Sequence, residues 1–366
     1  MRLHLYFARK FTRMLLSVFG VFVLILMLLD VVEEIRRYDI DTISFGQALG
    51  LAALNAPTGL YAILPLIVML ATLALFLGLA RSSELVIARA SGRSALHSLI
   101  APLLTALLAG VLAVAVLNPL VAATAKQYDA LSSHYKRGSD SVLSISGDGL
   151  WLRQGGPEGQ MVIRAARSNP DGTKLFDVTF LSFEPGTGPL FRIEAESATL
   201  GQGEWVLTHA KRWDLSDPDT NPERNATLHD SLSLKSDLTA DRIRDSFGAP
   251  ASIPVWEMPG FIAELERAGF SARPHRVWFQ MELALPLVFV AMVMIGAGFT
   301  MRHTRLGGSG VMVLIALGLG LALYFLRDFA QVLGENGQIP VALAAWSPPV
   351  IAILMSLGLL LHLEDG

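Results

Sequence analysis

Two stretches of more than thirty residues without a charged side chain, residues 42–80 and 94–125, dominate this sequence. About 20 apolar residues in a row are enough to cross the hydrocarbon core of a bilayer, so stretches of this kind are typical of membrane spans. The mean hydropathy of +0.48 and the low content of charged residues, 17%, agree with this interpretation. The sequence therefore predicts an integral membrane protein.

The apolar stretches divide into six predicted spans. The first, residues 11–32, follows a basic N-terminal segment and lacks the small-residue cleavage site of a signal peptide. Pro57 and Pro65 divide the stretch that follows, which predicts an interfacial segment over 44–57 and a second span over 58–80. The other four spans are expected at residues 96–120, 277–301, 307–326 and 343–362.

Residues 126–273 have a different pattern, in which charges return and Gly and Pro separate short alternating apolar runs. Regularly spaced short strands predict a β-sandwich or jellyroll-like domain between spans 3 and 4. A linker at 236–255 and a short amphipathic helix at 256–268 should follow. Residues 1–125 then hold spans 1–3, and residues 274–366 hold spans 4–6. The expected strands are 149–153, 161–164, 176–183, 190–194, 204–207 and 227–234.

Basic residues in the short loops predict the orientation. Arg36 and Arg37 lie on one side of the membrane, and all the other short-loop bases lie on the opposite side. Because cytoplasmic loops carry an excess of Lys and Arg, both termini should be cytoplasmic and the β domain external. The bases on the cytoplasmic side are Arg2, Arg9, Lys10, Arg13, Arg81, Arg89, Arg93, Arg302 and Arg305.

A short polar segment, residues 81–93, separates spans 2 and 3. Ser82 suits a helix N-cap, Glu84 falls in the first turn and Gly92 suits the C-terminal stop, which predicts a helix over 82–92. This segment is either an ordinary basic turn that obeys the positive-inside rule or a coupling helix that transmits force between a membrane subunit and a soluble motor. The residues alone leave both interpretations open.

Catalytic signatures are missing from the sequence. There is no phosphate-binding G-x-x-x-x-G-K-[ST] loop, no H-E-x-x-H, no G-x-S-x-G and no cysteine. We therefore expect no catalytic residue, no bound cofactor and no metal. The net charge of −3 argues against a nucleic-acid partner. Arg36, Arg37 and Arg327 are the best candidates to meet anionic groups near the outer membrane boundary.

Several motifs resemble one known family. The segment Ser83–Gly92 is similar to the S-E-L-x-x-x-x-A-[SC]-G pattern of the LptF/LptG lipopolysaccharide-export permeases. Gly149-Leu-Trp, Pro286-Leu and Leu323-Tyr-Phe also fit that family, and the Ala-Ser-Gly ending with the C-terminal half is closer to LptG than to LptF. Ala88 departs from the family, because relatives often carry a bulkier methionine there.

The resemblance implies a permease of the bacterial inner membrane that pairs with a six-span LptF-like paralogue on a cytosolic ABC ATPase dimer. The ATPase would use ATP, and this chain would bind no cofactor. Lipopolysaccharide would enter from the outer leaflet through a lateral gate formed by spans 1 and 5, and then pass to the β-jellyroll and a periplasmic bridge protein. The segment docking on the ATPase would include Ser83, Glu84, Leu85, Ala88, Arg89 and Gly92.

The same resemblance assigns expected roles to other residues. Arg36, Arg37 and Arg327 would meet the lipid headgroup, and Gly310, Gly318 and Gly320 would belong to the lateral gate. Asp30 and Glu282 place acids where bases would favour an anionic lipid. These acids either pair with Arg36 or Arg37, or the headgroup in this lineage is less phosphorylated.

Two other functions compete with lipid export. A mechanotransmission permease would deliver the work of an ATPase to periplasmic partners without moving lipid. A membrane-anchored β domain would use its spans only as anchors, but an anchor needs neither six spans nor a capped helix between spans 2 and 3. We therefore rank the anchor last.

Overall fold

The chain folds into two compact units in the computed structural model. The helical unit comprises Met1–Arg137, Pro254–Trp256 and Arg273–Gly366, and the β unit comprises Gly138–Ile253 and Glu257–Ala272. The structure describes residues 2–37, 44–82, 84, 94–135, 143–146, 149–156, 159–169, 172–184, 188–201, 203–216, 221–236, 238–239, 243, 250–267, 270–301 and 309–365.

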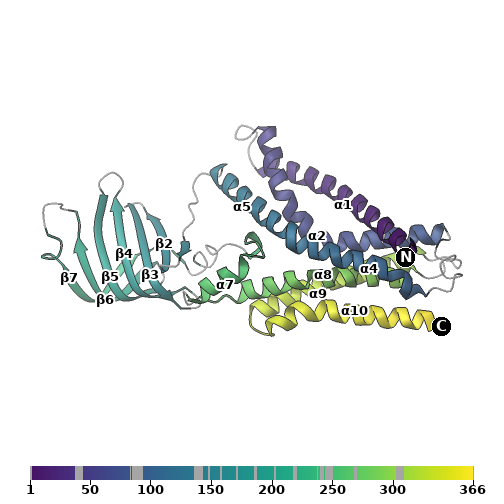
Figure 1. The fold of residues 1–366 in the computed structure, drawn as a ribbon. Coiled ribbons are helices and arrows are strands. Elements are labelled where there is room, and N and C mark those ends of the chain that lie inside the picture. Colours follow the sequence, from purple (N-terminus) through teal and green to yellow (C-terminus); the bar gives the residue numbers. More distant parts are fainter. Residues whose placement is uncertain are drawn as a thin grey trace. The chain divides into compact units, whose positions relative to one another are not determined.

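Six helical segments of the described chain are long and apolar enough to cross a membrane, as predicted. The third is continuous from α4 through a π-helical turn, η1, into α5. In Figure 1, α1 begins and α10 ends at the same end of the helical unit. The helices are α1 (Arg2–Arg37), α2 (Phe45–Arg81), α4 (Ala95–Leu112), η1 (Ala113–Leu117), α5 (Asn118–Tyr135), α8 (Arg273–Thr300), α9 (Ser309–Glu335) and α10 (Val341–Asp365).

Helix α2 is unbroken, so the predicted division into an interfacial segment and a shorter span is wrong. The helix begins at a capping box, in which Ser44 and Gln47 satisfy each other's backbone N–H groups, and it continues through Pro57 and Pro65. Each proline removes one backbone hydrogen bond. Membrane helices tolerate this loss because neighbouring helices and local adjustments satisfy the groups set free.

Helix α8 is the centre of the helical unit. It packs against α2, α4, α9 and α10, and most of its side chains are buried. Helices α1 and α9 are at the other extreme, because only 6% and 17% of the residues in their most apolar 18-residue stretches are buried within the chain. Their apolar faces therefore require lipid or another membrane protein as a neighbour.

Small residues allow the central helices to approach closely. Gly110 of α4 faces Pro286 of α8, where a Cβ atom on the glycine would lie 2.5 Å from the proline Cα. Gly296 of α8 faces Thr72 of α2 in the same way. Small residues at such crossings are typical of membrane helix interfaces, where association depends on close van der Waals packing.

The β unit contains one antiparallel sheet of seven strands in sequential order, β1 to β7 (Figure 1). The inserted β domain is confirmed, and its strand order is that of a meander. All six predicted strands are present, β1 is additional, and the predicted amphipathic helix is α7 (Met258–Arg267). The strands are β1 (Leu143–Ser146), β2 (Gly149–Gly156), β3 (Gly159–Ser168), β4 (Lys174–Glu184), β5 (Gly188–Leu200), β6 (Glu204–Asp214) and β7 (Thr227–Lys235).

A crease crosses this sheet from β3 to β7. In each of these five strands one residue lacks the regular backbone pairing with the neighbouring strand, and the five residues lie side by side across the sheet. Two of them have positive φ, 52° at Asp177 and 51° at His209. Inward-facing positions shift by one residue at the crease, as between Leu207 and Ala210 of β6. Because all five strands shift together, the register is kept on both sides. The skipped residues are Ala166, Asp177, Glu196, His209 and Asp230.

The sheet curves around an apolar core. Phe180 and Trp205 pack edge to face at its centre, with ring centroids 6.3 Å apart. Leu265 of α7 and Phe270 complete the core. The Gln154 side chain on β2 donates to the Lys235 carbonyl and accepts from the Ser236 hydroxyl at the end of β7, so the two edges of the sheet approach each other.

We predict that Gly110→Ala destabilises the full chain by about 1–3 kcal/mol, because the new methyl group overlaps the Pro286 backbone. The gain in helix propensity, at most about 1 kcal/mol, does not offset the overlap. Gly20→Ala on α1 is the matched control, since no atom of the described residues lies within 4 Å of its added Cβ. The measurement is the thermal unfolding midpoint in detergent. Equal midpoints for the two variants would contradict the prediction.

Candidate functional site

The Glu84 carboxylate lies against the first turns of α1. The Lys10 ammonium donates to both carboxylate oxygens, at 2.9 Å and 3.0 Å. The Tyr6 hydroxyl donates to Oε2 at 2.8 Å, and the Ser82 hydroxyl donates to Oε1 at 2.8 Å. The side chain of Glu84 is thus fully engaged with α1 and with the end of α2. We call Tyr6, Lys10, Ser82 and Glu84 the Glu84 cluster.

The local sequence positions this cluster. Tyr6 and Lys10 are four residues apart and therefore share one face of α1, where the Lys10 ammonium also donates to the Tyr6 hydroxyl at 3.2 Å. Phe7 and Phe11 lie on the neighbouring face of these turns, about 100° round the helix, where they are buried in the apolar core and hold α1 in place. Ser82 is the C-cap residue of α2.

The cluster holds Glu84 in its charged form. Partial burial alone would raise the pKa of the Glu84 carboxyl, but the hydrogen bonds from Lys10, Ser82 and Tyr6 outweigh it, and the pKa is lowered. A carboxyl group whose pKa is lowered by folding stabilises the folded state above its unfolded pKa. That contribution is lost as the pH falls through the lowered value. The contact is therefore present in full at neutral pH.

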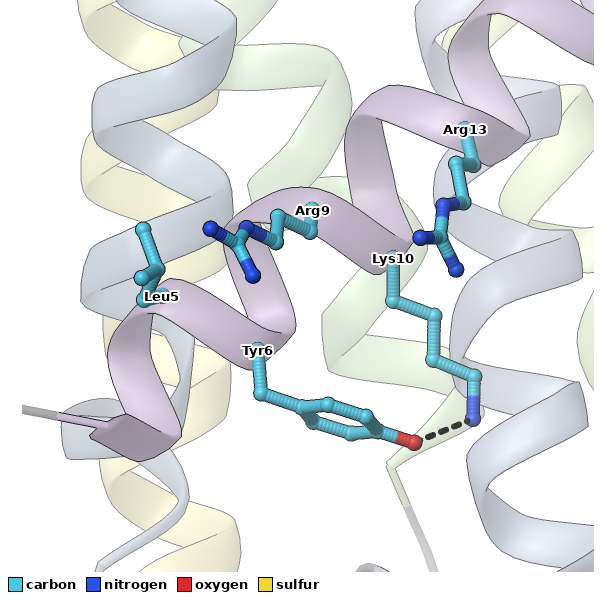
Figure 2. A pocket seen from close by; sticks show the side chains of 5 residues that line it. All are labelled: Leu5, Tyr6, Arg9, Lys10 and Arg13. Carbon is cyan, nitrogen blue, oxygen red and sulfur yellow. Dashed lines mark hydrogen bonds between the residues drawn. The ribbon is translucent and has the colours of Figure 1, made fainter.

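A shallow pocket of about 400 Å³ lies beside the cluster (Figure 2). Among the described residues its lining comes from the first turns of α1, and Arg9 and Arg13 contribute two exposed guanidinium groups to it. The Glu84 cluster therefore lies at a basic surface. The lining residues are Leu5, Tyr6, Arg9, Lys10 and Arg13.

Glu84 is the one residue of the predicted docking segment whose structure is described. The other residues of that segment fall outside the described part of the chain. They are Ser83, Leu85, Ala88, Arg89 and Gly92.

Arg36 and Arg37, the predicted headgroup residues, both lie beside acids on their own helix. Arg36 is 3.5 Å from Glu33, and its side chain is 81% exposed. Arg37 donates to the Tyr128 hydroxyl at 2.8 Å and lies 3.9 Å from Glu34, whose side chain is only 2% exposed. The two arginines therefore differ, because Arg36 is available to a ligand and Arg37 compensates a buried acid.

The other predicted lipid and gate residues lie on α9. Arg327 is partly buried, and its charge acts on Glu282 and Tyr61. Gly310 and Gly318 face open space within the described part of the chain, where no atom lies within 4 Å of an added Cβ. Gly320 is instead packed against methionines of α2 and α8, so it serves helix packing.

Asp30 and Glu282 do not pair with Arg36 or Arg37 in the described structure. Asp30 accepts a hydrogen bond from Asn55 of α2 at 3.1 Å. Glu282 accepts from the Tyr61 hydroxyl and, at 3.4 Å, from Asn118. The pairing offered for these acids from the sequence is therefore wrong, because nearer neutral donors satisfy them.

Sequence reasoning missed two groups of residues. Lys10 and Tyr6 contact Glu84 across more than seventy positions of chain, and Asn118 and Tyr61 contact Glu282 across more than one hundred and sixty. The four-residue spacing of Tyr6 and Lys10 was the available signal for the first group. No cluster of three metal-ligating side chains is found among the residues that the structure describes.

The architecture defines a class, that of a six-span membrane protein with a β domain inserted between spans 3 and 4. The sequence profile of the lipopolysaccharide export system permeases LptF/LptG matches residues 5–362. The chain belongs to this family. It is also similar to the lipopolysaccharide export system permease protein LptG of Haemophilus influenzae, with 23% identity over 339 residues, which is 91% of each chain.

We predict that Lys10→Glu and Glu84→Lys each destabilise the helical unit and that the double charge reversal restores most of the loss. The expected coupling energy is about 1 kcal/mol, as for a partly exposed ion pair. Arg13→Glu, which reverses a neighbouring exposed charge on the same helix, is the control. The measurement is a double-mutant cycle of thermal unfolding at neutral pH. Additive effects of the two single changes would show that the contact is not formed in solution.

Proposed function

We propose that this chain is the non-catalytic permease subunit of an ABC transporter that extracts lipopolysaccharide from the bacterial inner membrane and passes it to a periplasmic bridge. A six-span LptF-like paralogue and a cytosolic ABC ATPase dimer would complete the transporter. ATP would be bound and hydrolysed by the ATPase, and this chain would bind no cofactor. Membership of the LptF/LptG family supports the export role.

The observation that carries the proposal is the exposure of α1 and α9. Both helices are strongly apolar, yet few residues of their most apolar stretches are fully buried, and each helix keeps an exposed apolar face, with Leu24 and Leu28 on α1 and Leu314 and Phe325 on α9. A pure membrane anchor has no need for two spans that each expose a broad apolar face. Two such helices offer a lateral surface to acyl chains and to a paralogous permease, which agrees with a gate formed by spans 1 and 5.

The distribution of charge supports the orientation. The Glu84 cluster and its surrounding bases lie at the ends of α1 and α2, and an excess of bases favours the cytoplasmic side. Both termini would then be cytoplasmic, and the β unit would be periplasmic. In this orientation Glu84 faces the compartment that contains the ATPase, while Arg36 lies at the height of a lipid headgroup.

The first test is a detergent pull-down of the tagged wild-type chain and of Glu84→Lys, with mass spectrometry of the bound proteins and lipids. We expect the wild type to retain an ABC ATPase, a second six-span permease and lipid A-containing glycolipid. We expect Glu84→Lys to lose at least about nine-tenths of the ATPase, because charge reversal disrupts the Glu84 cluster. Arg224→Glu, which reverses an exposed charge in the β unit, is the control and should retain it.

The outcomes separate the candidate functions. Bound ATPase without lipopolysaccharide would favour mechanotransmission without lipid transport. Absence of both would leave residues 81–93 as an ordinary loop and contradict the transporter. Full retention of the ATPase by Glu84→Lys would remove Glu84 from the coupling site.

We also predict that Arg36→Glu lowers the amount of co-purified lipopolysaccharide about five-fold or more, because one base at a membrane surface contributes about 1 kcal/mol to the binding of anionic lipid. Its exposed side chain and weak contact with Glu33 leave the fold intact. Arg37→Glu should instead lower the thermal stability, since it leaves the buried Glu34 without its counter-charge. Arg224→Glu in the β unit is the control. Unchanged lipid in Arg36→Glu would mean that this arginine serves only orientation.

A further inference from the structure

Asn118 is a buried polar residue at the point where the π-helical turn of span 3 ends. Its side chain is 2% exposed. The amide oxygen accepts a hydrogen bond from the backbone N–H of Val255 at 2.8 Å, and the amide nitrogen donates to Glu282 of α8 at 3.4 Å. One side chain therefore joins three segments that are distant in sequence.

The π-helical turn itself provides a second attachment. A change between π and α hydrogen-bond registers leaves a backbone carbonyl without its usual helical partner, and such turns often occur at functional sites. The carbonyl of Ala115, inside the turn Ala113–Leu117, accepts a hydrogen bond from the Trp256 indole N–H at 3.2 Å. Val255 and Trp256 are thus bound side by side to this one turn of span 3.

These contacts extend into the helical core through Glu282. Its side chain is 4% exposed and accepts a hydrogen bond from the Tyr61 hydroxyl of α2. The charge of Arg327 on α9 acts on the same carboxyl group. This polar group therefore connects spans 2, 3 and 4, and a charge on span 5 acts on it. We call it the Asn118 junction; its members are Tyr61, Ala115, Asn118, Val255, Trp256 and Glu282.

Val255 and Trp256 lie in a short segment whose neighbours on both sides belong to the other unit. Pro254–Trp256 belongs to the helical unit, although the residues on both sides of it belong to the β unit. The chain passes between the two units at Arg137–Gly138 and Ala272–Arg273, and it also does so on both sides of Pro254–Trp256. Hydrogen bonds from Val255 and Trp256 bind this short segment to the helical unit.

We propose that Asn118 is a positioning residue that couples movements of the spans to the β unit. It fixes Pro254–Trp256 to the π-helical turn, so that a change in the packing of α2 and α8 around Glu282 is transmitted to the chain entering α7. The inference rests on the proposed function, since the transmitted movement would serve the transfer of lipopolysaccharide to the β unit.

The test uses the absence of cysteine from the natural chain. Cysteines at the exposed positions Lys126 of α5 and Ala263 of α7 accept spin labels, and pulsed electron paramagnetic resonance measures the distance distribution between them. Asn118→Ala should widen the distribution at least about two-fold. Thr124→Val is the matched control, because the only partner of its hydroxyl among the described residues is the Val121 carbonyl of its own helix.

Trp256→Phe is the second variant and keeps the test decisive if Asn118→Ala folds poorly. It keeps an aromatic ring but loses the hydrogen bond to Ala115, and it should widen the distribution to a smaller degree. An unchanged distribution in both variants would overturn the proposal. The distance measurement needs no transport activity, so failure of the export function would be seen separately.

A second measurement distinguishes positioning from general structural damage. In the complete transporter reconstituted with its ATPase, Asn118→Ala should release about five-fold less lipopolysaccharide per ATP hydrolysed, while the ATPase rate stays within about two-fold of the wild type. A parallel fall of both rates, with an unchanged ratio, would show that Asn118 supports only the fold.

Discussion

A backbone N–H or C=O group in a hydrocarbon environment must find its hydrogen-bond partner within the protein, and the helical unit is organised around this requirement. It explains why α2 remains one helix through Pro57 and Pro65. It also explains the Asn118 junction, because the π-helical turn needs partners from outside its own helix. Trp256 donates to the Ala115 carbonyl of this turn, and Asn118, directly after the turn, accepts from the Val255 N–H. The chain between β7 and α7 is thereby bound to span 3.

The β unit meets the same requirement through the pairing of strands, and the crease shows its consequence. A flat sheet with strict alternation cannot bend around an apolar core without changing which residues face inward. If one strand alone had an extra residue, its register with both neighbours would be lost. Because five adjacent strands skip a residue at one level, the sheet bends while its ladders stay paired on both sides.

The sequence could predict features that depend on local patterns. Six spans follow from charge-free apolar stretches, and the six longer strands follow from alternation. The predicted strands over 161–164, 190–194 and 204–207 stop just before Ala166, Glu196 and His209, because alternation ends at the crease. The site was less predictable. Glu84 could be identified by its motif, but its partners Lys10 and Tyr6 are set by the packing of α1 against α2, which no local pattern encodes.

Two polar contacts at different levels of α2 suggest how the proposed transporter would work. The Glu84 cluster follows the end of α2 at Arg81, and Tyr61 joins α2 to the Asn118 junction. Twenty residues of helix separate them, a distance of roughly 30 Å at 1.5 Å per residue. Between these levels the helices meet through apolar and small side chains, such as Gly296 against Thr72, whose contacts are not directional. One continuous helix joins the two levels, so a movement imposed at Glu84 would be carried along α2 to the Asn118 junction.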